Sequence, residues 1–267
     1  MIHSNSEGDI YIEEMPLLLV HLREEEKGAD ARLSEVLSYA LDGYAYETAT
    51  EISAFEDYVN RWRRLEKTQN RKNPVQGRIL FAVPLGTSGI NLELYRLIRF
   101  LREHPDFLNG FVGGLLVDSE NDLYSKSAAK DLVFAANCAG CAFVGRPLVE
   151  GTRTLSNYTI VSNNLGTDLM GAYRESAAGL VKEVLGTDCV RKKCPKVLVL
   201  HASSHKTSNT YAIWNRVKEQ LPEMEIREIG LRNGTLSDCA GCPYKMCLHF
   251  GEQGSCFYGG VMVEDVY

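Results

Sequence analysis

The sequence predicts an α/β protein: a doubly wound parallel sheet, followed by the first half of a second unit of the same kind. Apolar runs of strand length alternate with helical patterns along the chain, which is typical of a parallel sheet covered by helices on both faces. The alternation stops in a cysteine-containing, basic stretch at 187–195 and restarts at Lys196. We therefore expect a first domain over residues 1–190 and a second over residues 196–267.

The elements of the first domain follow from the spacing of apolar residues, which is continuous in short strands and repeats every three or four positions in helices. Strands are expected at 17–20, 44–50, 79–83, 111–117 and 142–144. Helices are expected at 33–41, 55–67, 92–101, 128–136 and 167–185. We expect Gly186 to cap the last helix and the polar stretch 148–164 to be irregular.

The second domain begins with an apolar strand at 196–200 that leads directly into a Ser/Thr-rich loop and a helix at 211–221. Hydroxyl groups, backbone N–H groups and the positive end of the helix dipole together suit a phosphate group. The polar loop residues also suit helix capping, so residue chemistry alone leaves both interpretations open. The loop has neither the GK[ST] motif of triphosphatases nor the GxGxxG of dinucleotide-binding folds.

Four cysteines follow the next strand, at 225–229, in the pattern C-x2-C-x4-C-x8-C: Cys239, Cys242, Cys247 and Cys256. Four thiolates at short spacing suit a tetrahedral zinc site or an iron–sulfur cluster. Free thiols, disulfides or a redox dithiol at the first pair remain alternatives. We predict a metal or cluster site at these four residues.

Composition limits the classes of partner and the compartment. The formal net charge is −6, which argues against nucleic acid. No apolar run approaches the roughly 18 residues of a membrane span, and the polar start of the chain is unlike a signal peptide. We expect a cytoplasmic protein with no membrane partner, in which the cysteines stay reduced.

The loop after the second domain's first strand resembles that of the flavodoxin-like NAD(P)H-dependent FMN reductases and iron–sulfur flavoproteins. Ala202 replaces the usual Gly, and His205 stands where Arg is common. The resemblance implies FMN as cofactor, NAD(P)H as electron donor and a small-molecule or protein acceptor. The residues that it assigns to FMN are Ser203, His205, Ser208, Asn209 and Thr210.

The resemblance also implies an FMN-dependent oxidoreductase in which the flavin performs the hydride chemistry, so no catalytic acid or base is expected. The corresponding loop of the first domain, 23–28, carries three consecutive glutamates that would repel a phosphate. We therefore expect the first domain to be a degenerate flavodoxin-like domain. His21, His104 and His249 belong to no visible constellation of carboxylates or thiols.

The second domain shows two strands where an FMN domain needs about five. The chain is expected to be a fragment of a longer protein; alternatively, the first domain or a partner chain, as in a homo-oligomer, supplies the missing strands. A second hypothesis is a non-enzymatic metal-binding or assembly module, in which a zinc or iron–sulfur site stabilises a degenerate α/β scaffold.

Overall fold

A computed structural model describes residues 15–21, 23, 27–68, 76–188, 196–202, 208–230, 241–253 and 255–257. The chain divides into two compact units, Met1–Cys189 (unit 1) and Val190–Tyr267 (unit 2). None of the described helices combines the length and the apolar content that a membrane crossing requires.

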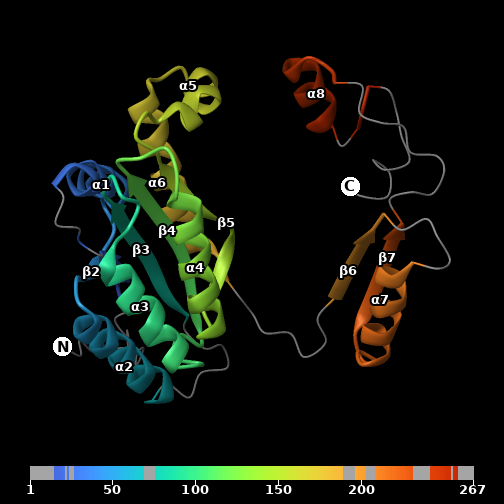
Figure 1. Ribbon diagram of the computed structural model, residues 1–267, viewed down its shortest axis with the longest axis horizontal. Helices are drawn as coiled ribbons and strands as arrows, with labels where there is room; N and C mark the ends of the chain where they lie inside the picture. Colours follow the sequence, from blue (N-terminus) through green and yellow to red (C-terminus); the bar gives the residue numbers. More distant parts are fainter. Residues whose placement is uncertain are drawn as a thin grey trace, which may run out of the picture. The chain divides into compact units, whose positions relative to one another are not determined.

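Unit 1 is an α/β domain built on a five-stranded parallel sheet in the order β2-β1-β3-β4-β5 (Figure 1). The strands are β1 (Leu17–His21), β2 (Tyr46–Ala49), β3 (Gly77–Leu85), β4 (Phe111–Ser119) and β5 (Ala142–Gly151). The helices are α1 (Lys27–Ala40), α2 (Ile52–Thr68), α3 (Leu92–Glu103), α4 (Ser125–Cys138), η1 (Ser156–Tyr158), α5 (Thr159–Leu165) and α6 (Leu169–Gly186). This order is compatible with a flavodoxin-like fold.

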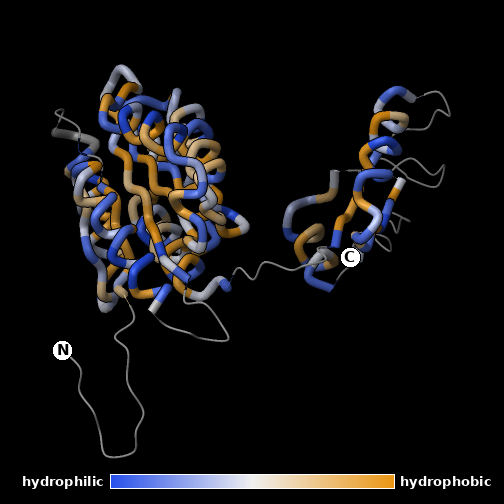
Figure 2. Tube along the Cα trace, turned by 90° about the horizontal axis from the view of Figure 1, so that it is seen from below, coloured by the Kyte–Doolittle hydropathy of each residue, from blue (hydrophilic) through white to orange (hydrophobic). Residues whose placement is uncertain are grey.

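Two apolar layers enclose the sheet. Leu18 and Val20 of β1 face a core shared with α2, α3 and α4, whereas Leu17 and Leu19 face a core shared with α1 and α6. Figure 2 shows the hydrophobic strands passing through the middle of unit 1. Because both faces are covered, the central strands read as continuous apolar runs, which explains why they could be predicted from the sequence.

Side-chain caps fix where two of the helices begin. Asn91 caps α3: its side chain accepts a hydrogen bond from Leu94 N at 2.9 Å and donates one to Pro84 O at 2.8 Å. Asp168 caps α6 by accepting from Gly171 N at 2.6 Å. The prediction that Gly186 caps this helix is wrong, because α6 includes Gly186 and its cap is Thr187.

The prediction of an irregular stretch at 148–164 is also wrong. Strand β5 continues to Gly151, because its pairing with β4 resumes after a bulge: Phe143 pairs with Gly113, and Leu148 pairs with Leu115. Gly145 and Pro147 lie between these two pairs, and both residue types disfavour a regular strand. Beyond them, η1 and α5 form because the buried Tyr158 stacks on Tyr173 of α6, with 5.3 Å between ring centroids.

Unit 2 contains two parallel strands, β6 (Lys196–His201) and β7 (Glu225–Gly230), joined by α7 (Asn209–Glu219), and a further helix α8 (Tyr244–Gly251). Helix α7 lies along one face of this pair (Figure 1), held by contacts of Tyr211 with His201 and Glu228. On β6, Leu198 is 58% exposed and Leu200 is 49% exposed. Two apolar side chains of this strand therefore lack cover from the described residues.

Candidate functional site

The β6–α7 connection holds the predicted phosphate loop. Ser208 caps α7 by accepting a hydrogen bond from Tyr211 N at 3.3 Å, as its residue type allows. Asn209 and Thr210 form the exposed start of the helix. The structure thus brings three predicted residues together at one helix N-terminus. Ser203 and His205 lie outside the described residues.

The position of this connection is set by the two strands. His201 ends β6 and pairs in register with Gly230, which ends β7, so the chain leaves both strands at the same edge. A Cβ at Gly230 would lie 3.4 Å from the His201 ring, and that ring lies 5.1 Å from the ring of Tyr211. The His201 imidazole therefore packs between the end of β7 and helix α7.

Helix α7 is fixed to β7 through Glu228. This carboxylate accepts hydrogen bonds from Lys218 and, at 3.4 Å, from the hydroxyl of Tyr211. The hydrogen bond from Lys218 lowers the pKa of Glu228. The N-terminus of α7 is thereby held beside the carboxyl ends of both strands, where parallel sheets bind their ligands.

Three of the four predicted metal-binding cysteines are described. Cys242 precedes α8, Cys247 lies within it, and Cys256 follows it; all three are free thiols. The chain returns toward α8 after the helix, since Ser255 N donates to Phe250 O at 2.8 Å. The described residues contain no group of three or more metal-ligating side chains. Cys239 lies outside the described residues, so the four-thiolate site stays a prediction.

An ion pair that could not be anticipated from sequence patterns occupies the carboxyl edge of the sheet in unit 1. Asp118, at the end of β4, is fully buried and accepts from Arg32 of α1 at 2.7 to 3.1 Å. The guanidinium also donates to the backbone oxygens of Ser119, Thr152 and Arg153. One side chain thus joins α1 to the ends of β4 and β5.

Tyr173 of α6 lies beside this ion pair. A Cβ on Gly151 would lie 2.7 Å from Asp118 and 2.8 Å from the ring of Tyr173, so glycine is needed where β5 ends. Burial raises the pKa of Asp118 while Arg32 opposes that rise. Burial, together with the nearby Asp118 carboxylate, raises the pKa of Tyr173 well above its ordinary value. This edge is therefore filled by the protein's own charged and aromatic groups.

One further pair corrects the prediction that His21 has no carboxylate partner. His21 ends β1, is 8% exposed and lies with its Nε2 2.8 Å from Oδ1 of Asp30. Burial lowers the pKa of His21, while Asp30 opposes this effect. The sequence did contain a signal for this pair: a polar residue ends a strand, and an acidic residue follows in the first turn of the next helix.

Comparison with known protein families and with curated protein sequences gives no match for this chain. A functional proposal for it rests on the chemistry of its own residues.

Proposed function

We propose that unit 2 binds FMN through the β6–α7 connection and that the protein is an oxidoreductase that passes electrons from NAD(P)H to an acceptor. In this proposal unit 1 is flavodoxin-like and unit 2 begins a second such unit. The observation that carries it is the polar start of α7 at the edge where both parallel strands end. Such an edge is the usual ligand site of doubly wound sheets.

The residues present fit the phosphate group of FMN. Ser208 uses its oxygen as the acceptor for Tyr211 N, so its hydroxyl hydrogen is available to a phosphate oxygen. Asn209 and Thr210 are exposed in the first turn, where backbone N–H groups and the helix dipole favour an anion. When bound, the flavin would supply the hydride chemistry, and these residues would hold its phosphate.

Unit 1 supports placing the cofactor in unit 2. At its own carboxyl edge, Asp118 is buried and paired with Arg32, whose guanidinium also donates to three backbone oxygens. A guanidinium that is paired with a carboxylate and has each of its three nitrogens engaged in a hydrogen bond is a poor anchor for a phosphate. In this proposal unit 1 therefore has a structural role.

The proposal requires further strands beside β6. Within the described part of unit 2, β6 pairs only with β7, and Leu198 and Leu200 are exposed on it. A flavin ring needs loops from several neighbouring strands of a doubly wound sheet. Leu198 and Leu200 lie on one face of β6, and the helices that connect such further strands would cover that face.

The cysteines favour a second candidate function, a non-enzymatic module with a structural zinc or iron–sulfur site. Cys242, Cys247 and Cys256 are free thiols around one short helix, and Cys247 and Cys256 are exposed. Thiols in this state can bind a metal ion once they are deprotonated. The two candidates differ in visible spectrum and metal content: FMN gives the two-band spectrum of a flavin, zinc is colourless, and an iron–sulfur cluster absorbs broadly and brings iron with it.

The test uses the full chain, its visible absorption spectrum, metal analysis and titration with FMN followed by flavin fluorescence. Replacing Ser203 and Asn209 together by Ala is expected to weaken FMN binding about tenfold or more, because two donors to the phosphate are removed. Asn215→Ala, in the same helix but away from its N-terminus, is the matched control. NAD(P)H oxidation by the FMN-loaded chain tests the electron donor.

Unchanged FMN affinity in the double variant would remove the loop from the site. A colourless protein that contains zinc and does not bind added FMN would favour the structural module instead.

A further inference from the structure

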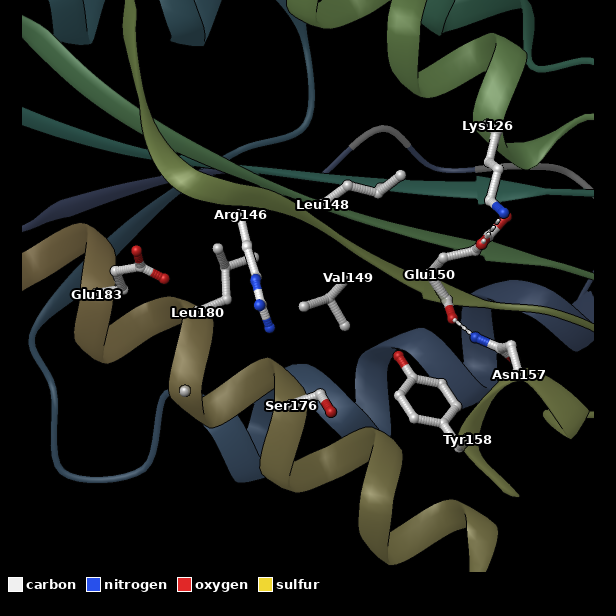
Figure 3. Close-up of a pocket in the computed structure, with 11 residues that line it drawn as sticks. Lys126, Arg146, Leu148, Val149, Glu150, Asn157, Tyr158, Ser176, Leu180 and Glu183 are labelled. Carbon is white, nitrogen blue, oxygen red and sulfur yellow. Dashed lines mark hydrogen bonds and ion pairs between the residues drawn. The ribbon is translucent and has the colours of Figure 1, made fainter. Parts of the chain in front are cut away.

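Unit 1 contains a cavity of about 550 Å³ between β5 and α6 (Figure 3). Its volume lies within the range of sites for small molecules. The bulge in β5 forms one wall, because the residues that have no partner on β4 lie over α6 there. This cavity is separate from the proposed FMN site, which lies in unit 2.

One end of the cavity carries two charged side chains without a partner among the described residues. Arg146 extends from the bulge toward α6, and Glu183 lies on α6 (Figure 3). A Cβ at Gly145 would lie 3.7 Å from Glu183 Oε1, so the carboxylate is adjacent to the residue that precedes Arg146. Both residues are exposed to solvent, and their side chains form no ion pair with each other.

The charges at the other end are already compensated. The Glu150 carboxylate accepts a hydrogen bond from the hydroxyl of Ser125 and lies 3.9 Å from Lys126 Nζ. The backbone oxygen of Glu150 accepts from Asn157 Nδ2 at 2.8 Å (Figure 3). A charged ligand group therefore gains most beside Arg146 and Glu183.

The wall between the two ends is mainly apolar. Val149 of β5, Leu180 of α6 and the ring of Tyr158 line it, and Leu180 and Tyr158 are buried. Gly179 faces open space, because a Cβ there would meet nothing within 4 Å. An aliphatic or aromatic group could lie along this wall and lose its contact with water.

We propose that this cavity binds an α-amino acid with an apolar side chain. The carboxylate of the ligand pairs with the Arg146 guanidinium, which presents two parallel donors to it. The ammonium group pairs with Glu183, and the side chain lies over Val149, Leu180 and Tyr158. A zwitterion satisfies both unpaired charges at once, whereas a simple carboxylate or a simple amine leaves one of them unpaired.

Calorimetric titration of the full chain tests the ligand class. L-Leucine is the probe, and 4-methylpentanoate and 3-methylbutylamine are analogues that lack the ammonium and the carboxylate group respectively. Each analogue is expected to bind about tenfold or more weakly than leucine, because one charge-assisted hydrogen bond is lost. Equal binding of either analogue, or no saturable heat from leucine at about 10 mM, would overturn the proposal.

Variants locate the site within the molecule. Arg146→Gln and Glu183→Gln are each expected to weaken leucine binding about tenfold or more. Arg102→Gln, at an exposed position on α3, is the matched control and should leave binding unchanged. Gly179→Leu, which fills the cavity from α6, should abolish binding while circular dichroism shows retained helix. Leucine affinity that none of the three cavity variants changes would contradict the proposal. The result is independent of flavin binding, since no FMN is added.

Discussion

Strands β1 and β6 have nearly the same sequence character and opposite environments. Each is an apolar run that ends in a histidine, His21 in β1 and His201 in β6. Every residue of β1 is buried, whereas β6 alternates between exposed and half-buried positions. The difference lies in the neighbours: β1 has a strand on each side and helices over both faces, and β6 pairs only with β7 in the described part of unit 2. An apolar run in the sequence thus predicts a strand, but it does not show which strands and helices bury that strand.

The largest expected effect is a difference in stability between variants that remove an ion pair in unit 1 and in unit 2. Arg32→Ala leaves the fully buried Asp118 without a partner, and we expect it to destabilise unit 1 by about 3–5 kcal/mol. Lys196→Ala removes the exposed pair with Glu225 in unit 2 and should change stability by no more than the error of the measurement.

Urea unfolding, followed through the buried Trp62 in a Trp214→Phe background, measures the loss in unit 1. Arg32→Lys is a useful control, because it retains the charge without the paired donors. If Arg32→Ala were as stable as the parent, Asp118 would have to be protonated or hydrated in the folded protein.

A smaller difference in stability is expected between leucine-to-alanine variants at matched positions of β1 and β6. Leu18 of β1 and Leu198 of β6 occupy equivalent positions three residues before the histidine that ends each strand. Leu18→Ala should destabilise unit 1 by about 2–5 kcal/mol, because it leaves a cavity in a closed core. Leu198→Ala should have little effect on unit 2, since that side chain is already 58% exposed. The comparison fails if both variants lose the same free energy of unfolding, with Trp62 and Trp214 as the separate probes.

Periodicity was enough to predict the sheet strands that are buried on both faces. It failed at β5, because Gly145, Arg146 and Pro147 break the apolar pattern locally while β4 pairs with the strand again beyond the bulge. Helix α5 was missed for a similar reason: its Ser- and Asn-rich sequence has weak helix propensity, and packing on α6 stabilises it. Tertiary contacts of this kind leave no trace in a local window of sequence.

Residues of the candidate sites could be predicted only where their role depends on neighbours in the sequence. Ser208 could be expected at a helix cap from its residue type and position. The pairing of Arg32 with Asp118 joins residues 86 positions apart and follows no periodic rule. It depends on strand order, which places the end of β4 near α1, and strand order cannot be read from one sequence.

The smallest expected effect concerns pH. Burial holds the pKa of His21 below its ordinary value of 6.5, so the unfolded chain takes up this proton at a higher pH than the folded one. The contribution of His21 to stability is therefore complete above about pH 6.5 and is lost as the pH falls through the lower folded pKa.

Unfolding of unit 1, followed through Trp62 between about pH 8 and pH 5, should show this decline. His21→Gln should flatten it, and His201→Gln in unit 2 serves as the control. A slope that His21→Gln leaves unchanged would assign the decline to other groups.

The guanidinium of Arg32 holds α1, β4 and β5 through a single set of bonds, so these segments cannot separate one at a time without breaking it. Amide hydrogens at the three places should then exchange with solvent together, at one common rate of opening, rather than in a graded series. Unit 1 would behave at this edge as a single cooperative block, and the loss of one side chain would divide it into parts that open independently.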